Sequence, residues 1–301
     1  MKPYQLIFLL ILWAGNTTAC DICGCSGGLS AGGLFPQVQN NLLGVRNSWQ
    51  HFDHPRGNFN GTSEVLKDHI YETDLFLRWF PRKRLQVWVN TPYRIVNRIE
   101  TERITSFSGI GDIQARAFYT VIKPDTNYHK FKHFLLAGGG VSLPTGKYRQ
   151  RDENLALLPL GLQIGSGAWA LMGNAVYLIQ THRVGLQIQG DYRMNFENED
   201  TFKKGNNLGA QTGIFLRSKL FRNVLFLPQL SYRAEKSLSD IEFGLIRPVS
   251  GIETQSLQLS AECFGKGWMA SVLVRKPIWQ KAPSEIPLSG MMLQITAGIT
   301  W

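Results

Sequence analysis

The sequence has no hydrophobic run long enough to cross a bilayer as a helix. The apolar stretch at residues 6–14 has about nine residues, whereas a transmembrane helix needs roughly 20. No window shows the apolar residues at every third or fourth position that an amphipathic helix requires. These two absences exclude a helical membrane protein and leave no clear helical domain.

The chain also lacks a clustered basic patch and an internal linker. Lys and Arg number 32 against 22 Asp and Glu, a net charge of +10, but the basic residues are spread along the chain. A nucleic-acid binder concentrates such residues on one face, so we expect no nucleic acid as a partner. No low-complexity tract or shift in composition divides the chain, and we expect one folded domain after the leader.

The first nineteen residues have the pattern of an export signal. Lys2 supplies the positive start, residues 6–14 form the apolar core, and small residues, the last of them Ala19, precede the expected cleavage site. We therefore predict a signal peptide over 1–19, a Cys/Gly-rich periplasmic segment over 20–36 and the folded domain over 37–301.

Period-2 alternation of apolar and polar residues runs through the rest of the chain and predicts β-strands. The last eleven residues, MMLQITAGITW, place an apolar side chain at every second position. Such a strand has one apolar and one more polar face. We expect twelve strands. They cover residues near 41–50, 71–79, 85–90, 112–121, 132–143, 168–180, 184–193, 208–217, 224–234, 253–264, 268–275 and 291–301.

The connections between these segments alternate in length. Short connections are expected near 80–84, 181–183, 218–223 and 265–267, with one of middling length over 123–131. Long connections are expected near 51–68, 97–110, 144–167, 195–206, 235–252 and 277–289. Short turns at one end and long loops at the other are typical of a bacterial outer-membrane barrel. An even number of strands returns both termini to the short-turn, periplasmic side.

The aromatic residues favour a membrane barrel over a soluble one. On the apolar face they lie at strand ends, as Tyr71 and Trp79 do. Their separation spans roughly 20 Å along the membrane normal, at ~3.3 Å per residue and ~40° tilt, close to the ~25 Å apolar band between two aromatic girdles. We predict an all-β fold, a closed antiparallel transmembrane β-barrel of about 12 strands in contact with lipid in the cell outer membrane. We expect Trp301 to be the insertion signal that the barrel-assembly machinery reads.

The polar faces of the same strands predict the lining of the barrel. Rings of charged side chains set selectivity in pores, and about twelve strands enclose more space than the side chains of an eight-stranded barrel fill. The alternative is a salt-bridged interior that fills a closed scaffold. The predicted lumen-lining residues are Arg46, Glu72, Asp74, Arg78, Asp112, Arg116, Asp191, Arg193, Arg217, Arg233 and Arg275, with Glu262 among them.

Two stretches resemble a known group of outer-membrane barrels. SGIGDIQARAFYTV (108–121) is followed by FLLAGGGVSLPTGKY (134–148), and together they resemble barrels of the MetA-pathway phenol-degradation, or transporter-like, type. The segment CDICGC, followed by GGLFPQVQNNLLGVR, is similar to a Bacteroidetes subgroup with an N-terminal Cys cluster. The resemblance implies a barrel that carries small molecules, and it supplies no catalytic residues.

The glycines of these motifs do not form a nucleotide site. Residues 109–112 lack the third glycine of a dinucleotide fingerprint, and 140–147 have the wrong spacing for a phosphate loop, with Tyr148 in place of Ser or Thr. We interpret 109–112 as a strand entry and 143–147 as a strand exit, where Pro144 ends pairing. No Gly-x-Ser-x-Gly elbow is present, and we expect no enzyme.

Three of the four cysteines, Cys20, Cys23 and Cys25, lie within six residues. Thiolates at this spacing can bind Cu or Zn. Two of them can instead form a disulfide, since export favours oxidation, or Cys20 can carry a lipid anchor. Cys263, near a short periplasmic turn, is a candidate fourth partner. We favour one soft metal ion, Cu(I), held by the three clustered sulfurs.

A second candidate metal site lies in the first expected long loop. Imidazole and carboxylate side chains gather there in sequence and are ligands for Zn or Cu. The residues are His51, Asp53, His54, Asp68 and His69.

The sequence therefore supports two functions of different classes. The first is an outer-membrane channel or transporter for small molecules or ions. The second is a non-conducting barrel whose cysteine cluster handles a metal or redox chemistry at its periplasmic end.

Overall fold

The computed structural model describes residues 38–57, 63–100, 103–124, 131–148, 163–220, 223–248, 250–283 and 286–301. The predicted signal peptide (1–19) and the Cys/Gly-rich segment (20–36), with Cys20, Cys23 and Cys25, lie outside these residues. No helix in the described residues is long and apolar enough to span a membrane.

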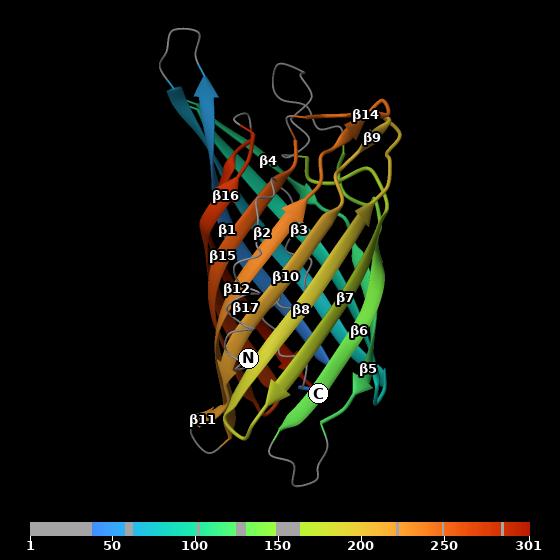
Figure 1. Ribbon diagram of the computed structural model, residues 1–301, viewed down its shortest axis with the longest axis vertical. Helices are drawn as coiled ribbons and strands as arrows, with labels where there is room; N and C mark the ends of the chain where they lie inside the picture. The colour runs from blue at the N-terminus through green and yellow to red at the C-terminus, as the bar shows by residue number, and fades with distance from the viewer. Residues whose placement is uncertain are drawn as a thin grey trace, which may run out of the picture.

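The described residues form a fourteen-stranded antiparallel sheet that is rolled into a barrel (Figure 1). Two of its strands, β4 (Arg103–Ile110) and β11 (Ser218–Leu220), pair only with the ends of a neighbour. Removing them leaves twelve strands in the wall. These are β1 (Leu42–Gly57), β2 (Ser63–Arg82), β3 (Leu85–Glu100), β5 (Gln114–Ile122), β6 (Lys132–Ser142), β7 (Ala170–Gln180), β8 (Val184–Asn195), β10 (Asn207–Leu216), β12 (Val224–Ser237), β15 (Ile252–Gly265), β16 (Trp268–Lys281) and β17 (Leu288–Thr300).

Two pairings close the barrel. The first and last strands of the wall pair from Leu42 opposite Thr300 to Asp53 opposite Leu288. Strands β10 and β12 are separated along the chain by the short β11, and they pair directly with each other. Every neighbour is antiparallel, so the twelve-strand closed antiparallel barrel predicted from the sequence is confirmed.

The connections confirm the predicted layout but correct several of its lengths. Short turns gather at one end, and the longer connections gather at the other, together with the small sheet of β9 (Phe202–Lys203), β13 (Ile241–Glu242) and β14 (Leu245–Ile246) (Figure 1). The expected long loop 51–68 is wrong, because β1 and β2 continue as a hairpin through most of it. The expected loop 97–110 is also wrong, because β3 continues to Glu100 and pairs with β4.

The outward face of the wall is a wide apolar belt. Large apolar side chains such as Leu75, Ile214 and Leu259 are more than half exposed. A soluble monomer rarely exposes so large a continuous apolar surface, so the belt faces lipid. Exposed aromatic residues border it in two rows, as the sequence predicts. The row toward the long loops contains Tyr71, Tyr93, Trp169 and Tyr192, and the row toward the short turns contains Trp79, Tyr119, Trp268 and Trp301.

Candidate functional site

The inward face of the wall changes character along the barrel. Because side chains alternate along each strand, every second residue points into the lumen. Near the short turns these residues are apolar, in the middle they are charged, and near the long loops they border a pocket of mixed character. The lumen is therefore the candidate functional site.

A layer of buried apolar side chains occupies the short-turn end of the lumen. It is called the apolar layer below. All of its members are at most 7% exposed. It consists of Leu42, Phe76, Trp88, Phe118, Phe134, Leu136, Val176, Leu178, Phe215, Leu227, Phe264 and Met269. Alternation alone does not reveal this layer, because Phe76 and Phe118 lie on the same face of their strands as charged residues.

Glycine makes room for the side chains of this layer. The ring of Phe118 meets Trp88 edge to face, with centroids 6.4 Å apart. A Cβ atom at Gly138 would lie 2.6 Å from Cδ1 of Phe118, and one at Gly140 would lie 2.6 Å from Cγ of Arg116. Real Cβ atoms do not come so close, so the run AGGG of β6 lets Phe118 and Arg116 lie flat against the wall.

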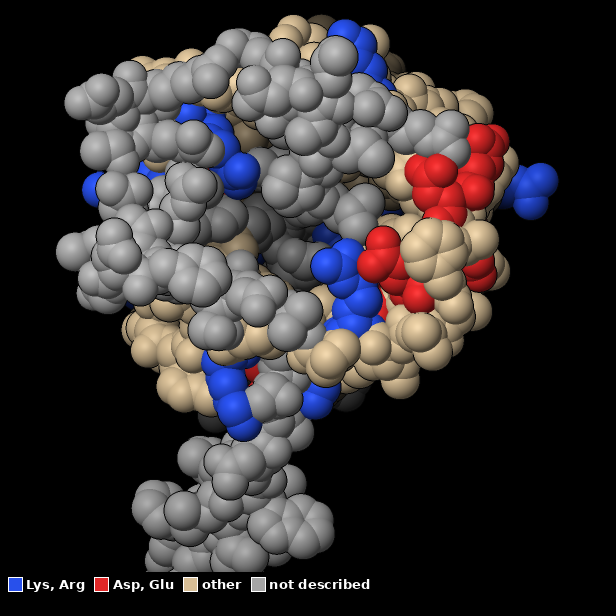
Figure 2. Space-filling model, turned by 90° about the horizontal axis from the view of Figure 1, so that it is seen from above, with Lys and Arg blue, Asp and Glu red and all other residues tan. Residues whose placement is uncertain are grey.

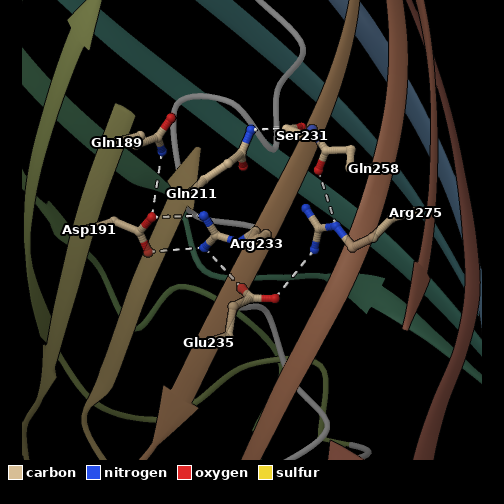
Figure 3. Close-up of polar contacts among 8 residues, drawn as sticks. All are labelled: Gln189, Asp191, Gln211, Ser231, Arg233, Glu235, Gln258 and Arg275. Atoms are coloured by element: carbon tan, nitrogen blue, oxygen red, sulfur yellow. Dashed lines mark hydrogen bonds and ion pairs between the residues drawn. The ribbon is translucent and has the colours of Figure 1, made fainter. Parts of the chain in front are cut away.

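Above the apolar layer, a ladder of alternating charges crosses β8, β12 and β16 (Figure 3). Asp191 accepts two hydrogen bonds from Arg233, at 2.9 and 3.1 Å. Arg233 also contacts Glu235 at 2.9 Å, and Glu235 lies 3.6 Å from Arg275. Arg275 donates to Gln258 at 3.3 Å. Bidentate contacts of this kind are among the stronger ion pairs, so the ladder stiffens this side of the lumen. It is called the β8–β16 ladder below.

The β8–β16 ladder depends on the absence of a side chain at Gly209. This residue stands opposite Asp191 on one side and opposite Glu235 on the other. A Cβ atom there would lie 2.3 Å from Oδ2 of Asp191 and 2.6 Å from a terminal nitrogen of Arg233. Arg233 can cross β10 to reach Asp191 because position 209 is glycine.

A second set of charge pairs lines β1, β2 and β3. Its members stand directly opposite one another in the strand register. Arg46 donates to Asp74 at 3.0 Å, and Arg98 binds Asp68 through two hydrogen bonds of 2.9 and 3.0 Å. Glu72 pairs with Arg94. The structure thus brings the predicted Arg46, Glu72 and Asp74 together. It adds Arg94 and Arg98, which were not among the predicted lining residues.

The remaining predicted lumen residues have different surroundings. Arg116 is buried on β5, where charges from both sets of pairs, such as Asp74 and Asp191, act on its guanidinium. Arg193 donates to Asn195 at 2.9 Å and to Ser142 at 3.3 Å. Glu262 is buried on the inward face of β15. Arg217 is exposed and lies between β10 and β11 at the short-turn rim, and its place in the lumen lining stays a prediction. The strand ends one residue before it.

A pocket opens at the long-loop end of the lumen, and Asp112 shapes it. The carboxylate of Asp112 accepts hydrogen bonds from the backbone N–H of Gly146 at 3.0 Å, and of Ser166 at 2.9 Å. The first bond joins the SGIGD motif to the LPTGK motif, and the second joins SGIGD to the segment that precedes β7. Charges of both signs surround this end of the molecule (Figure 2). The pocket lining includes Arg94, Asp112, Ile164, Trp169, Arg193 and Phe202.

The two candidate metal sites have different outcomes. Among the described residues, no group of three or more His, Cys, Asp or Glu side chains is placed to hold a metal. His69 stacks on Trp49, the ring of His51 lies tilted beside the same tryptophan, and Asp68 binds Arg98, so the second candidate site is wrong for these residues. The cluster Cys20, Cys23 and Cys25 lies outside the described residues. Cys263 alternates with the inward Glu262 and Phe264, so it lies on the outward face.

Residues 51–214 match the family model described as putative MetA-pathway of phenol degradation. The match covers more than half of the chain and includes both motifs that meet at Asp112. The chain belongs to this family. This confirms the family resemblance read from the sequence. No curated protein sequence matches the chain.

A solved structure confirms the fold. An outer-membrane channel from Pseudomonas putida F1 is similar over 89% of this chain and 97% of its own, with a TM-score of 0.65 and 14% identity. The translocator domain of the autotransporter NalP from Neisseria meningitidis has a TM-score of 0.46 and 10% identity, over 90% of this chain and 92% of its own. The first likeness, the apolar belt and the family place the chain among outer-membrane β-barrels.

Proposed function

We propose that this protein is an outer-membrane channel for small, partly apolar molecules. The observation that carries the proposal is the apolar layer, which fills the short-turn end of an otherwise polar lumen. A hydrophobic constriction gates a pore because water leaves it. Ions therefore meet a barrier there, while an apolar or aromatic solute finds favourable contacts.

The mixed pocket at the other end supports the same kind of solute. It places apolar side chains such as Ile164 and Phe202 beside charged ones such as Arg94. Binding pockets combine apolar walls with a few polar groups that orient a ligand. A solute with an apolar ring and a polar group would contact the pocket, pass the charge pairs and reach the apolar layer. Phenol, which the family description names, has this character.

Single-channel recording in planar bilayers tests the proposal. We expect low ionic conductance from the wild type, and a several-fold rise for Phe118→Ala, because the substitution opens the apolar layer. Tyr119→Ala is the matched control, since the neighbouring tyrosine is exposed on the lipid face. Its conductance should equal that of the wild type.

The rival function is a closed scaffold, in which the cysteine cluster outside the described residues handles a metal. That reading predicts no conductance from the wild type, from Phe118→Ala or from a Phe76→Ala, Phe118→Ala double variant. Such a result, obtained with barrels that are folded by gel mobility, would contradict the channel.

A further inference from the structure

Arg78 is the one member of the predicted lumen lining that lies inside the apolar layer. It stands opposite Leu42 on β1 and opposite Trp88 on β3, and its exposure is 0%. Placing a guanidinium charge among apolar side chains is costly unless the charge is paired and hydrogen-bonded.

Among the described residues, the terminal nitrogens of Arg78 have no such partner. Its Nε donates to the backbone oxygen of Asn40 at 3.2 Å, and its guanidinium carbon lies 5.6 Å from the ring centroids of both Phe80 and Trp88. The two terminal nitrogens are buried and have no hydrogen-bond partner in the described part of the chain. Glu262 acts on Arg78 through its charge.

Other lumen arginines show how different this arrangement is. Arg98 and Arg233 each present two nitrogens to the two oxygens of one carboxylate. Such a fork fits a carboxylate because the guanidinium is planar and its donors are fixed in direction. Arg78 carries the same fork, but no side-chain carboxylate of the described residues accepts a hydrogen bond from its terminal nitrogens.

We infer that Arg78 binds the carboxylate of a small aromatic acid as the acid passes the apolar layer. The two terminal nitrogens take the carboxylate oxygens, and the ring of the acid packs among the apolar side chains near Trp88 and Phe80. A small hydrated anion without a ring loses its water in this layer and gains no apolar contact. The inference rests on the proposed function and deepens it, because it names the substrate class that the apolar layer accepts.

Isothermal titration calorimetry on the full, folded protein in detergent tests this site without requiring conduction. The probes are sodium benzoate, neutral benzamide of the same shape, and sodium acetate, which lacks the ring. We expect the wild type to bind benzoate at least tenfold more tightly than either other probe. Equal affinity for benzoate and benzamide, or for benzoate and acetate, would overturn the proposal.

Substitutions assign the binding to Arg78. Arg78→Gln should weaken benzoate binding at least tenfold, and Arg78→Lys should weaken it less, because it keeps the charge but not the fork. Arg217→Gln is the matched control, since Arg217 is exposed at the rim of the same end, and it should bind benzoate as the wild type does. Unchanged affinity in Arg78→Gln overturns the proposal. If Arg78→Gln does not fold, Arg78→Lys and the wild-type probe series decide the question.

The two proposals can fail separately. Benzoate binding that depends on Arg78 in a protein that never conducts contradicts the channel and keeps the site. A conducting protein whose benzoate affinity is unchanged by both Arg78 variants keeps the channel and contradicts the site.

Discussion

Gly209 occupies the position at which one added methyl group would separate Asp191 from Arg233. The new Cβ would lie within 3 Å of both side chains, and their two hydrogen bonds would have to lengthen or break. Since hydrogen bonds to charged groups contribute roughly 1.5–3 kcal/mol each when buried, we expect Gly209→Ala to lower the free energy of unfolding by about 1–3 kcal/mol. A urea titration in lipid vesicles, followed by tryptophan fluorescence, measures this change.

Gly190 provides the control for that substitution. It lies one residue before Asp191 on β8, and a Cβ atom there would meet nothing within 4 Å. Gly190→Ala should leave the stability unchanged or raise it slightly, because alanine restricts the unfolded chain more than glycine does. If both alanine variants unfold at the wild-type urea concentration, Gly209 is not what allows the β8–β16 ladder to form.

Individual side chains show where sequence reasoning about the site succeeded and where it failed. Alternation alone identified Arg46, Asp74 and Arg233 as inward, because a strand of known phase fixes the face of each residue. It could not find the apolar layer, since Phe76 and Phe118 share their face with charged residues, and only the height along the barrel separates them. It also placed Arg217 inward, at a position where the structure shows an exposed residue just after the end of β10.

Each transmembrane strand has an outward face that the same alternation exposes to lipid. Val272 lies outward in β16 and is 42% exposed. It follows Trp268, a member of the aromatic row toward the short turns, by four residues. An arginine near the bilayer midplane of a barrel costs about 2–4 kcal/mol, and about 0–1 kcal/mol near the interface. We expect Val272→Arg to destabilise the folded barrel by about 2–4 kcal/mol in a lipid refolding titration.

Val184 allows the same change at another depth. It is also outward and exposed, but it is the first residue of β8 and follows a short turn. Val184→Arg should therefore cost about 1 kcal/mol or less, since its charge reaches the interface. Equal costs at the two positions would mean that Val272 does not lie deep in the membrane.

The strand ends were harder to predict than the strand faces. Beyond the membrane both faces of a hairpin meet water, so the alternation that marks a strand fades in the sequence. Strands β1 and β2 nevertheless continue to Gly57 and Ser63, because their backbones go on pairing in register. Pairing such as that of Asp68 with Arg98 supports the extended part of β2 and β3, and it joins residues that lie thirty positions apart in the sequence.

The barrel as a whole is closed by a seam between its two most distant strands. In lipid, each backbone N–H or C=O left without a partner costs several kcal/mol, so the wall is stable only when β1 has paired with β17. Closure could be predicted from this requirement together with the even number of strands in the sequence pattern. The pattern could not supply the register, in which Leu42 faces Thr300.

Gel mobility tests this closure directly. The full chain, recovered from the outer-membrane fraction, should migrate faster on SDS gels when unheated than after boiling, because the closed barrel stays compact in detergent. A chain that ends after Pro287 lacks β17 and therefore the seam, and it should migrate at one position whether or not it is heated. If the shortened chain keeps the fast, heat-sensitive band, the pairing of β1 with β17 is not what holds the barrel closed, and the wall can seal through another pair of strands.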